Sequence, residues 1–252
     1  MNIKNYLKRL NYKGELDTTL KTLKALHEAH AFTIPFENID VIAKKDISLK
    51  LKDILKKLID ENRGGYCYEL NKAFCFLLKE IGFDVQMSFA RVLYQNPTME
   101  NGVAPMSHQI TIVTINKKRY LADVGFGGFG IIHPIDIDSK KTTKQYNLKY
   151  KIKKIKNEYY LFAKTGKKYS AIYKFDLRDY LEIDYKYGNF FASNAPESRF
   201  VNNFICTKPT KTGRITILNS EFKVFKDGKS KSKKIDAKKR KKLLKRVFGI
   251  KI

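Results

Sequence analysis

The sequence predicts an α+β fold in which helices come first, strands follow and a smaller mixed unit ends the chain. Apolar residues recur at helical spacing up to Ile81, whereas from Val85 onward they alternate as they do in strands. After residue 178 the two patterns mix. At 252 residues, of which 43% are hydrophobic, the chain can form one large domain or a compact set of two or three.

Two amphipathic helices are expected near the start of the chain. The first lies within LDTTLKTLKALHEAHAFT, residues 16–33, where Asp17 can cap the helix. The second lies within residues 48–62, where Ser48 is the expected cap. The apolar residues that define these two helices are Leu16, Leu20, Leu23 and Leu26, then Leu51, Ile54, Leu55 and Leu58.

A third helix follows a pair of glycines. Its apolar positions are spaced i, i+3, i+4, i+7, and Gly82 stands where a helix C-cap is expected. Gly64 and Gly65 supply a sharp turn before it. The apolar positions are Leu70, Ala73, Phe74, Leu77, Leu78 and Ile81.

Strand patterns dominate the middle of the chain. Four stretches have strand-like patterns, and the last of them alternates apolar and polar residues, as expected for a meander or barrel with one face in water. A further alternating stretch near the C-terminus indicates a terminal hairpin. The middle stretches are residues 85–94, 108–115, 119–126 and 146–164, and the hairpin covers 213–228.

Cys67 lies just after the glycine turn, in or near the first turn of the third helix. Unpaired backbone N–H groups and the helix dipole favour an anion there. A thiolate is such an anion, and it is the reactive form of cysteine. The alternative is a small apolar residue in a buried helix.

His108 and Asp123 are the residues expected to complete a site around a nucleophilic cysteine. His108 opens one strand, Asp123 lies near the far end of the next, and the polar turn at Asn116 falls close to midway between them. A hairpin would therefore bring the two side chains together. A structural hydrogen bond is the alternative for such a pair. His27 and His30 are explained as surface residues of a charged helix, and His133 as a loop residue.

The chain resembles the arylamine N-acetyltransferase family at several motifs in order. Residues 63–71, RGGYCYELN, resemble the family signature that contains the nucleophilic cysteine. PFENID at 35–40, SHQITIV at 107–113, LADVGFGG at 121–128 and NAPESRF at 194–200 resemble further family segments. The lysine-rich end after Lys226 matches nothing in the family pattern.

The resemblance implies an N-terminal helical bundle, a central β-barrel and a C-terminal α/β lid, with a core similar to that of cysteine proteases and transglutaminases. The expected domains are residues 1–83 with the cysteine, 84–188 with the histidine and aspartate, and 189–252 as the lid with its basic segment.

The resemblance also implies a reaction. Acetyl-CoA would be the donor and co-substrate, an arylamine or arylhydrazine the acceptor, and Cys67 would carry the acetyl group in a ping-pong route. In this scheme Asp123 orients His108, and His108 holds Cys67 as a thiolate. No metal or prosthetic group is expected, since no pair of cysteines has zinc-ligand spacing.

Other roles follow by match to the family. Phe36, Phe126 and Phe200 correspond to residues that line the acceptor pocket, although ordinary core packing is the alternative for each ring. Ser107 and Gly127 resemble positions that contact CoA. Glu37 and Arg63 are expected to form a buried ion pair that braces the cysteine turn; an exposed pair is the alternative.

Composition bears on the compartment and on partners. Three scattered cysteines do not form a disulfide framework, and neither a leader peptide nor a membrane-spanning stretch is apparent, which indicates a cytoplasmic protein. The net charge of +26 would suit a nucleic-acid-binding protein, but lysines spread along the chain favour a solvated surface and no specific nucleic acid. The oligomeric state is not specified by the sequence.

Two further enzyme classes fit the same three residues. One is an amide synthase or other acyl transferase that uses a different acyl donor. The other is a Cys-His-Asp hydrolase.

Overall fold

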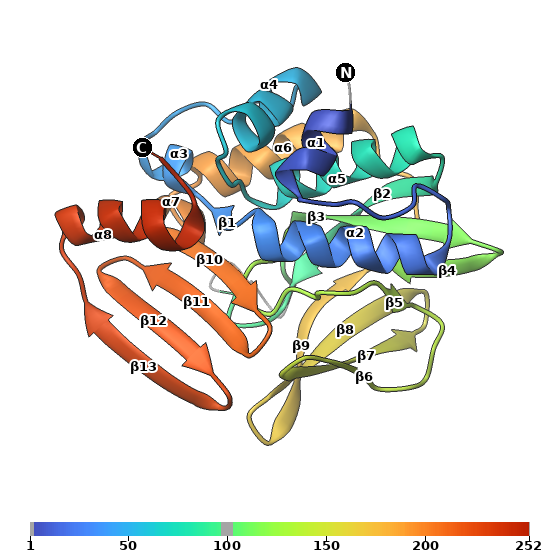
Figure 1. Cartoon of the computed structure of the whole chain (residues 1–252). Coiled ribbons are helices and arrows are strands. Elements are labelled where there is room, and N and C mark those ends of the chain that lie inside the picture. The colour runs from blue at the N-terminus through green and yellow to red at the C-terminus, as the bar shows by residue number, and fades with distance from the viewer. Residues whose placement is uncertain (1–2, 97–102, 252) are drawn as a thin grey trace.

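The computed structural model describes residues 3–96 and 103–251 (Figure 1). Its helices are α1 (Ile3–Arg9), α2 (Leu20–Thr33), α3 (Ile39–Ile42), α4 (Leu51–Leu55), α5 (Cys67–Ile81), α6 (Glu182–Asn194), α7 (Arg199–Asn202) and α8 (Ala237–Leu243). Two π-helical turns, η1 (Lys56–Asp60) and η2 (Leu244–Phe248), continue α4 and α8. The strands are β1 (Phe36–Glu37), β2 (Asp84–Val92), β3 (Met106–Ile115), β4 (Lys118–Leu121), β5 (Ile135–Asp136), β6 (Thr143–Gln145), β7 (Leu148–Ile155), β8 (Glu158–Thr165), β9 (Lys168–Phe175), β10 (Ile205–Thr210), β11 (Gly213–Leu218), β12 (Glu221–Lys226) and β13 (Lys229–Lys234).

The helical layer is built around α5. All six apolar residues of the predicted stripe lie on this helix, and five of them are buried; Ile81 is partly exposed. Gly82 ends the helix in the left-handed conformation at φ +105°, which confirms the expected C-cap. The helix therefore holds Cys67, its first residue, at a fixed place in the core.

The predicted start of α2 was wrong by a few residues. The helix begins at Leu20, and Thr19 is the N-cap that accepts a hydrogen bond from the Thr22 N–H. Asp17 instead accepts from the hydroxyls of Thr19 and Thr22, and Leu16 lies outside the helix, 46% exposed. At α4, likewise, Lys50 precedes the helix, and Ser48 accepts from its backbone N–H.

His27 and His30 are buried, which corrects the prediction that they lie on the surface. Both belong to α2 and contact the ring of Phe74 on α5. They follow Leu23 and Leu26 by four residues each, so they continue the apolar face of the helix. A neutral imidazole can pack there as an aromatic ring.

The eight-stranded antiparallel sheet curls beneath the helices in the order β5-β4-β3-β2-β9-β8-β7-β6 (Figure 1). The β3–β4 hairpin turns at Asn116 and Lys117, both with positive φ, and Ile115 pairs with Lys118. This is the two-residue turn that suits twisted strands. It confirms the expected hairpin, although Asp123 lies just beyond the end of β4.

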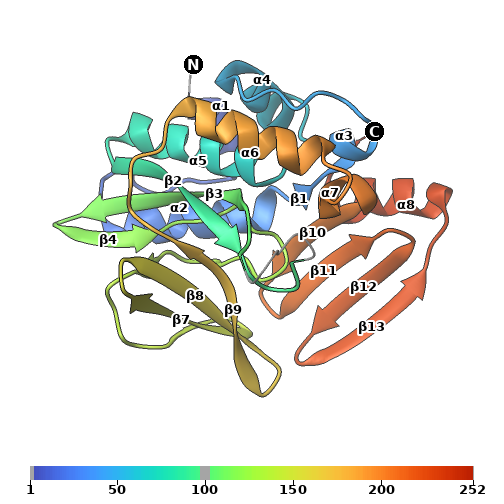
Figure 2. The ribbon, with the colours of Figure 1, turned by 180° about the vertical axis from the view of Figure 1, so that it is seen from behind.

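A second sheet, of order β1-β10-β11-β12-β13, forms the C-terminal part together with α8. The predicted hairpin corresponds to β11 and β12, but it is not terminal because β13 and α8 follow. Viewed from behind, α6 lies over the helical layer and leads to α7 beside this sheet (Figure 2). The α+β prediction of bundle, barrel and lid is confirmed; the exact domain boundaries stay a prediction, and α6 runs across the one expected after residue 188.

Candidate active site

The turn before Cys67 is closed by the side chain of Glu69. One Glu69 oxygen accepts a hydrogen bond from the Tyr66 backbone N–H at 3.1 Å, which caps the first turn of α5. A Cβ at Gly64 would lie 2.2 Å from the Pro35 carbonyl oxygen, so only glycine fits there. The two glycines therefore allow the chain to enter α5 tightly against the Pro35 segment.

His108 and Asp123 meet in the core beside Cys67. The Nε2 atom of His108 lies 2.8 Å from Oδ2 of Asp123, and both side chains are buried. The Cys67 sulfur lies 4.0 Å from the Ser107 carbonyl oxygen, and Cys67 is one of the groups that raise the pKa of His108. Because Nε2 of His108 bonds to Asp123, Nδ1 is the ring nitrogen that remains available to Cys67.

Asp123 is held by three donors besides His108. The Tyr173 hydroxyl donates to Oδ2 at 2.9 Å, while the Asn71 amide and the Gly125 backbone N–H donate to Oδ1 at 2.9 and 2.8 Å. Asn71 also donates to the Gln109 carbonyl at 2.6 Å. These bonds fix the carboxylate between α5, β3 and the loop after β4.

The pKa values of His108 and Asp123 are both shifted from their ordinary values. Burial disfavours the protonated ring of His108, but the negative charge and hydrogen bond of Asp123 outweigh it and, with Cys67, raise the pKa of His108 to about 10. Burial likewise disfavours the Asp123 carboxylate, but His108, Asn71 and Gly125 lower its pKa. At neutral pH the site therefore favours an imidazolium beside an ionised Asp123.

A cavity of about 250 Å³ opens onto these residues. Cys67 and His108 contribute to its wall, as do Phe36, Phe126 and Phe200. The Phe126 ring meets His108 edge to face at 5.1 Å, and the rings of Phe36 and Phe200 are 5.8 Å apart. The three phenylalanines that were predicted to line the acceptor pocket therefore all line one cavity.

Of the two residues expected to contact CoA, Ser107 lines the cavity and Gly127 does not. Gly127 has φ +75°, and its backbone lies against the Phe36 ring, where a Cβ would come within 3.0 Å. The cavity wall is formed instead by its neighbours Phe126 and Gly128. A direct role of Ser107 or Gly127 in binding CoA stays a prediction.

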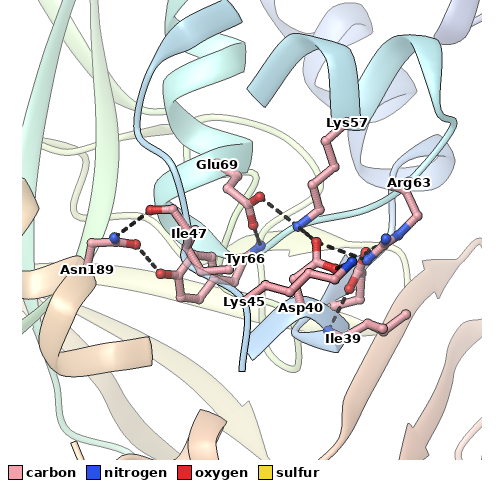
Figure 3. Close-up of polar contacts among 10 residues, drawn as sticks. Ile39, Asp40, Lys45, Ile47, Lys57, Arg63, Tyr66, Glu69 and Asn189 are labelled. Atoms are coloured by element: carbon pink, nitrogen blue, oxygen red, sulfur yellow. Dashed lines mark hydrogen bonds and ion pairs between the residues drawn. The ribbon is translucent and has the colours of Figure 1, made fainter. Parts of the chain in front are cut away.

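A network of ion pairs lies behind the cysteine turn (Figure 3). Arg63 contacts Glu37 at 2.9 Å and Asp40 at 3.3 Å, which confirms the expected buried Glu37–Arg63 pair. Lys57, on η1, contacts Asp40 at 2.8 Å and Glu69 at 2.7 Å. Because Glu69 also caps Tyr66, Lys57 links η1 directly to the turn that carries Cys67.

Asn71, Tyr173 and Lys57 were not identified by the sequence analysis. Asn71 could have been found, because it follows Cys67 by four residues and so lies on the same face of α5. Tyr173 comes from β9, and nothing in its local sequence indicates a contact with Asp123. Lys57 is one of many lysines, and only the fold distinguishes it.

The described residues offer neither a metal-binding cluster nor a membrane-spanning helix. Across residues 3–96 and 103–251, no three or more His, Cys, Asp or Glu side chains gather in a way suited to a metal ion. Over the same residues, no helix has both the length and the apolar composition needed to cross a bilayer.

A buried row of cysteine, histidine and aspartate at an apolar cavity is the arrangement of enzymes that use a cysteine nucleophile. A family profile described as N-acetyltransferase matches residues 19–252. The chain is 32% identical over 227 residues to the arylamine N-acetyltransferase of Escherichia coli, covering 90% of this chain and 80% of that protein. The chain belongs to the arylamine N-acetyltransferase family.

Solved structures agree with this membership. The arylamine N-acetyltransferase of Salmonella typhimurium superposes with a TM-score of 0.92 at 28% identity, covering 98% of this chain and 90% of that one. The Mycobacterium marinum arylamine N-acetyltransferase in complex with CoA gives 0.93 at 28% identity, covering 99% and 93%.

Proposed function

We propose that this enzyme transfers the acetyl group of acetyl-CoA to the nitrogen of an arylamine or arylhydrazine through an acetyl-cysteine at Cys67. The observation that supports it most is the Cys67–His108–Asp123 row opening onto a cavity lined by three phenylalanines. The cytoplasm is the proposed location, since Cys67, Cys75 and Cys206 are all free.

In the first half-reaction, the Cys67 thiolate attacks the thioester carbonyl. The first backbone N–H groups of α5 are in position to stabilise the oxyanion. The carbon–sulfur bond to CoA then breaks, and the imidazolium of His108 gives its proton to the departing thiolate. Asp123 keeps the ring oriented and stabilises its charge throughout.

In the second half-reaction, the acceptor nitrogen attacks the acetyl-cysteine. His108 takes the proton that the nitrogen loses, and Cys67 leaves as a thiolate, which restores the starting site. The rings of Phe36, Phe126 and Phe200 favour an aryl acceptor, since ring packing contributes roughly 0.5–1.5 kcal/mol beyond burial.

Mass spectrometry tests the intermediate. Incubation with acetyl-CoA without an acceptor should add about 42 Da, one acetyl group, to the peptide that contains Cys67. Cys67→Ala is the control and should gain nothing. Label on Cys75 instead would contradict the assignment; burial raises the pKa of that thiol to about 11, so it should stay unreacted.

Competition between acceptors tests the second substrate. Aryl hydrazides should discharge acetyl-Cys67 faster than alkyl amines, because an alkyl amine arrives as a cation that must be desolvated. Phe126→Ala should slow discharge more than loading in stopped-flow measurements. Equal use of alkyl amines and aryl hydrazides by the wild type would favour an amide synthase with the same three residues.

A further inference from the structure

Arg214 is a partly buried cation without an anionic partner. It lies on β11, and its Nη1 donates to the Gly127 carbonyl at 2.7 Å. Among the described residues, no carboxylate forms an ion pair with it. Burial lowers the pKa of the Arg214 guanidinium to about 10, so the side chain still carries its charge at neutral pH. Such a charge is costly to bury unless an anion approaches it.

Arg214 does not itself line the cavity, but its strand β11 does. Residues two apart on a strand share a face, so Arg214 lies on the same face of β11 as Thr216 and Leu218, which both line the cavity. Arg214 therefore lies about 7 Å from Thr216 along that row, toward the start of β11 at Gly213. Thr216 pairs with Thr207, and Thr207 pairs with Phe36, which places the row beside the acceptor pocket.

The loop that Arg214 contacts leads back to the nucleophile. A Cβ at Gly125 would lie 2.8 Å from the Cys67 Cα, so the Gly125 backbone touches the start of α5. Gly127 follows two residues later, a step of at most about 7 Å. Arg214 thus contacts the same short loop that touches the start of α5 at Cys67.

We infer that Arg214 binds the phosphate groups of the CoA donor while its thioester reaches Cys67. This inference rests on acetyl-CoA being the donor. The donor is the substrate with a strongly anionic end, and its flexible arm separates the phosphates from the thioester. A guanidinium with unused N–H groups matches phosphate oxygens in charge and in geometry.

Arg214→Gln tests the assignment in two assays. The KM for acetyl-CoA should rise about ten- to hundredfold, since hydrogen bonds between charged groups are the strong ones. Calorimetry on the unacetylated enzyme should show the same loss of affinity for CoA and no change for pantetheine, which has no phosphate. Arg214→Lys should recover part of the affinity for CoA because it keeps the charge.

Loading by p-nitrophenyl acetate provides the internal control. This donor has no phosphate, so its acetylation of Cys67 should be unchanged in Arg214→Gln. Lys226→Gln is the matched control variant, because Lys226 pairs with Gly213 and so faces the opposite side of the same sheet. It should leave both donors unaffected.

Two results would overturn the inference. An unchanged KM for acetyl-CoA in Arg214→Gln would show that the phosphates bind elsewhere. An equal loss with p-nitrophenyl acetate would show that Arg214 only braces the Gly127 loop. Wild-type enzyme that is acetylated by p-nitrophenyl acetate but never by acetyl-CoA would instead remove the proposed function, and the assignment with it.

Discussion

Asp123 accepts hydrogen bonds from four groups, and each comes from a different part of the chain. His108, Tyr173, Asn71 and the Gly125 N–H leave its carboxylate almost no freedom to rotate. Because a carboxylate accepts at both oxygens, it can satisfy all four donors at once. An amide in the same place has one accepting oxygen and carries no charge.

Asp123→Asn should therefore lower kcat/KM for acetyl transfer on the order of 10³-fold or more, since an amide cannot stabilise the imidazolium. Steady-state kinetics with an aryl hydrazide would measure the loss. Tyr173→Phe is the matched control, because it removes one donor from the same oxygen but keeps the charge, and it should stay within about tenfold of wild type. Asp123→Asn within the same range would mean that Asp123 is only structural.

At the scale of elements, η1 and α5 are joined by Lys57. Its ammonium group lies between Asp40 and Glu69. Burial would lower its pKa, but the negative charges of Glu69, Glu37 and Asp40 outweigh burial and raise that pKa. Burial would raise the pKa of Asp40, but Lys57 and Arg63 outweigh it and lower that pKa to about 2. Lys57 thus joins Glu69, next to the nucleophile's turn, to Asp40, which also pairs with Arg63 and Lys45.

Lys57→Met should lower the free energy of unfolding by about 3 kcal/mol, because it leaves the buried carboxylate of Glu69 without its cation. Urea unfolding would measure this change. Lys56→Met is the neighbouring control: Lys56 is exposed and 4.0 Å from Glu61, so its loss should have no measurable effect. Equal stabilities for the two variants would contradict the role given to Lys57.

The buried histidines of α2 make the fold sensitive to acid. Burial lowers the pKa of His27 to about 4 and that of His30 to about 3, against an ordinary value of 6.5. Below pH 6.5 the unfolded chain binds protons that the folded chain excludes. The free energy of unfolding should therefore fall as the pH drops toward 4.

His30→Phe should remove about 1.4 kcal/mol per pH unit from that acid sensitivity, the contribution of one proton. Urea titrations at pH 7, 6 and 5 would measure the slope in wild type and variant. A phenylalanine keeps the ring contact with Phe74 and has no titratable nitrogen. Parallel slopes in the two proteins would show that the acid sensitivity arises elsewhere.

Much of this element structure could be predicted because its signals are local. The stripe of α5, the Gly82 cap and the β3–β4 turn each depend on residues close in sequence, and His108 and Asp123 meet through that one hairpin. The misassigned histidines had a local signal too, since they continue the Leu23 and Leu26 face of α2. Tyr173 contacts Asp123, and Arg214 contacts Gly127, only because segments distant in sequence pack together, which no local spacing encodes.

At the scale of the whole molecule, lysines are spread along the chain, and their densest run lies on β13 and α8. Every residue of β13 is exposed, and α8 contributes further lysines. Behind these lysines, Leu244, Phe248 and Ile250 are buried in an apolar cluster. Lysines along an edge strand also discourage pairing with another sheet.

Mobility-shift assays should accordingly show weak, sequence-blind binding of DNA that disappears at physiological salt, because its only source is the surface charge. Two unrelated duplexes of equal length would serve as the comparison. Salt-resistant retention of one duplex over the other would require a specific nucleic-acid site.

The short strand β1 has a consequence for the order in which the enzyme matures. The Glu37 backbone N–H donates a hydrogen bond to the Gly65 carbonyl, and β1 pairs with β10. The side-chain oxygen of Asn38 accepts a hydrogen bond from the backbone N–H of Ile205, which lies 167 residues further along the chain. Ribosomes add roughly 5–20 residues per second, so Cys67 is made about 7–30 s before the strand that secures its turn. The turn that carries Cys67 is therefore not fully formed while the chain is being synthesised. We expect the Cys67 thiol to become reactive only when the polypeptide is nearly complete.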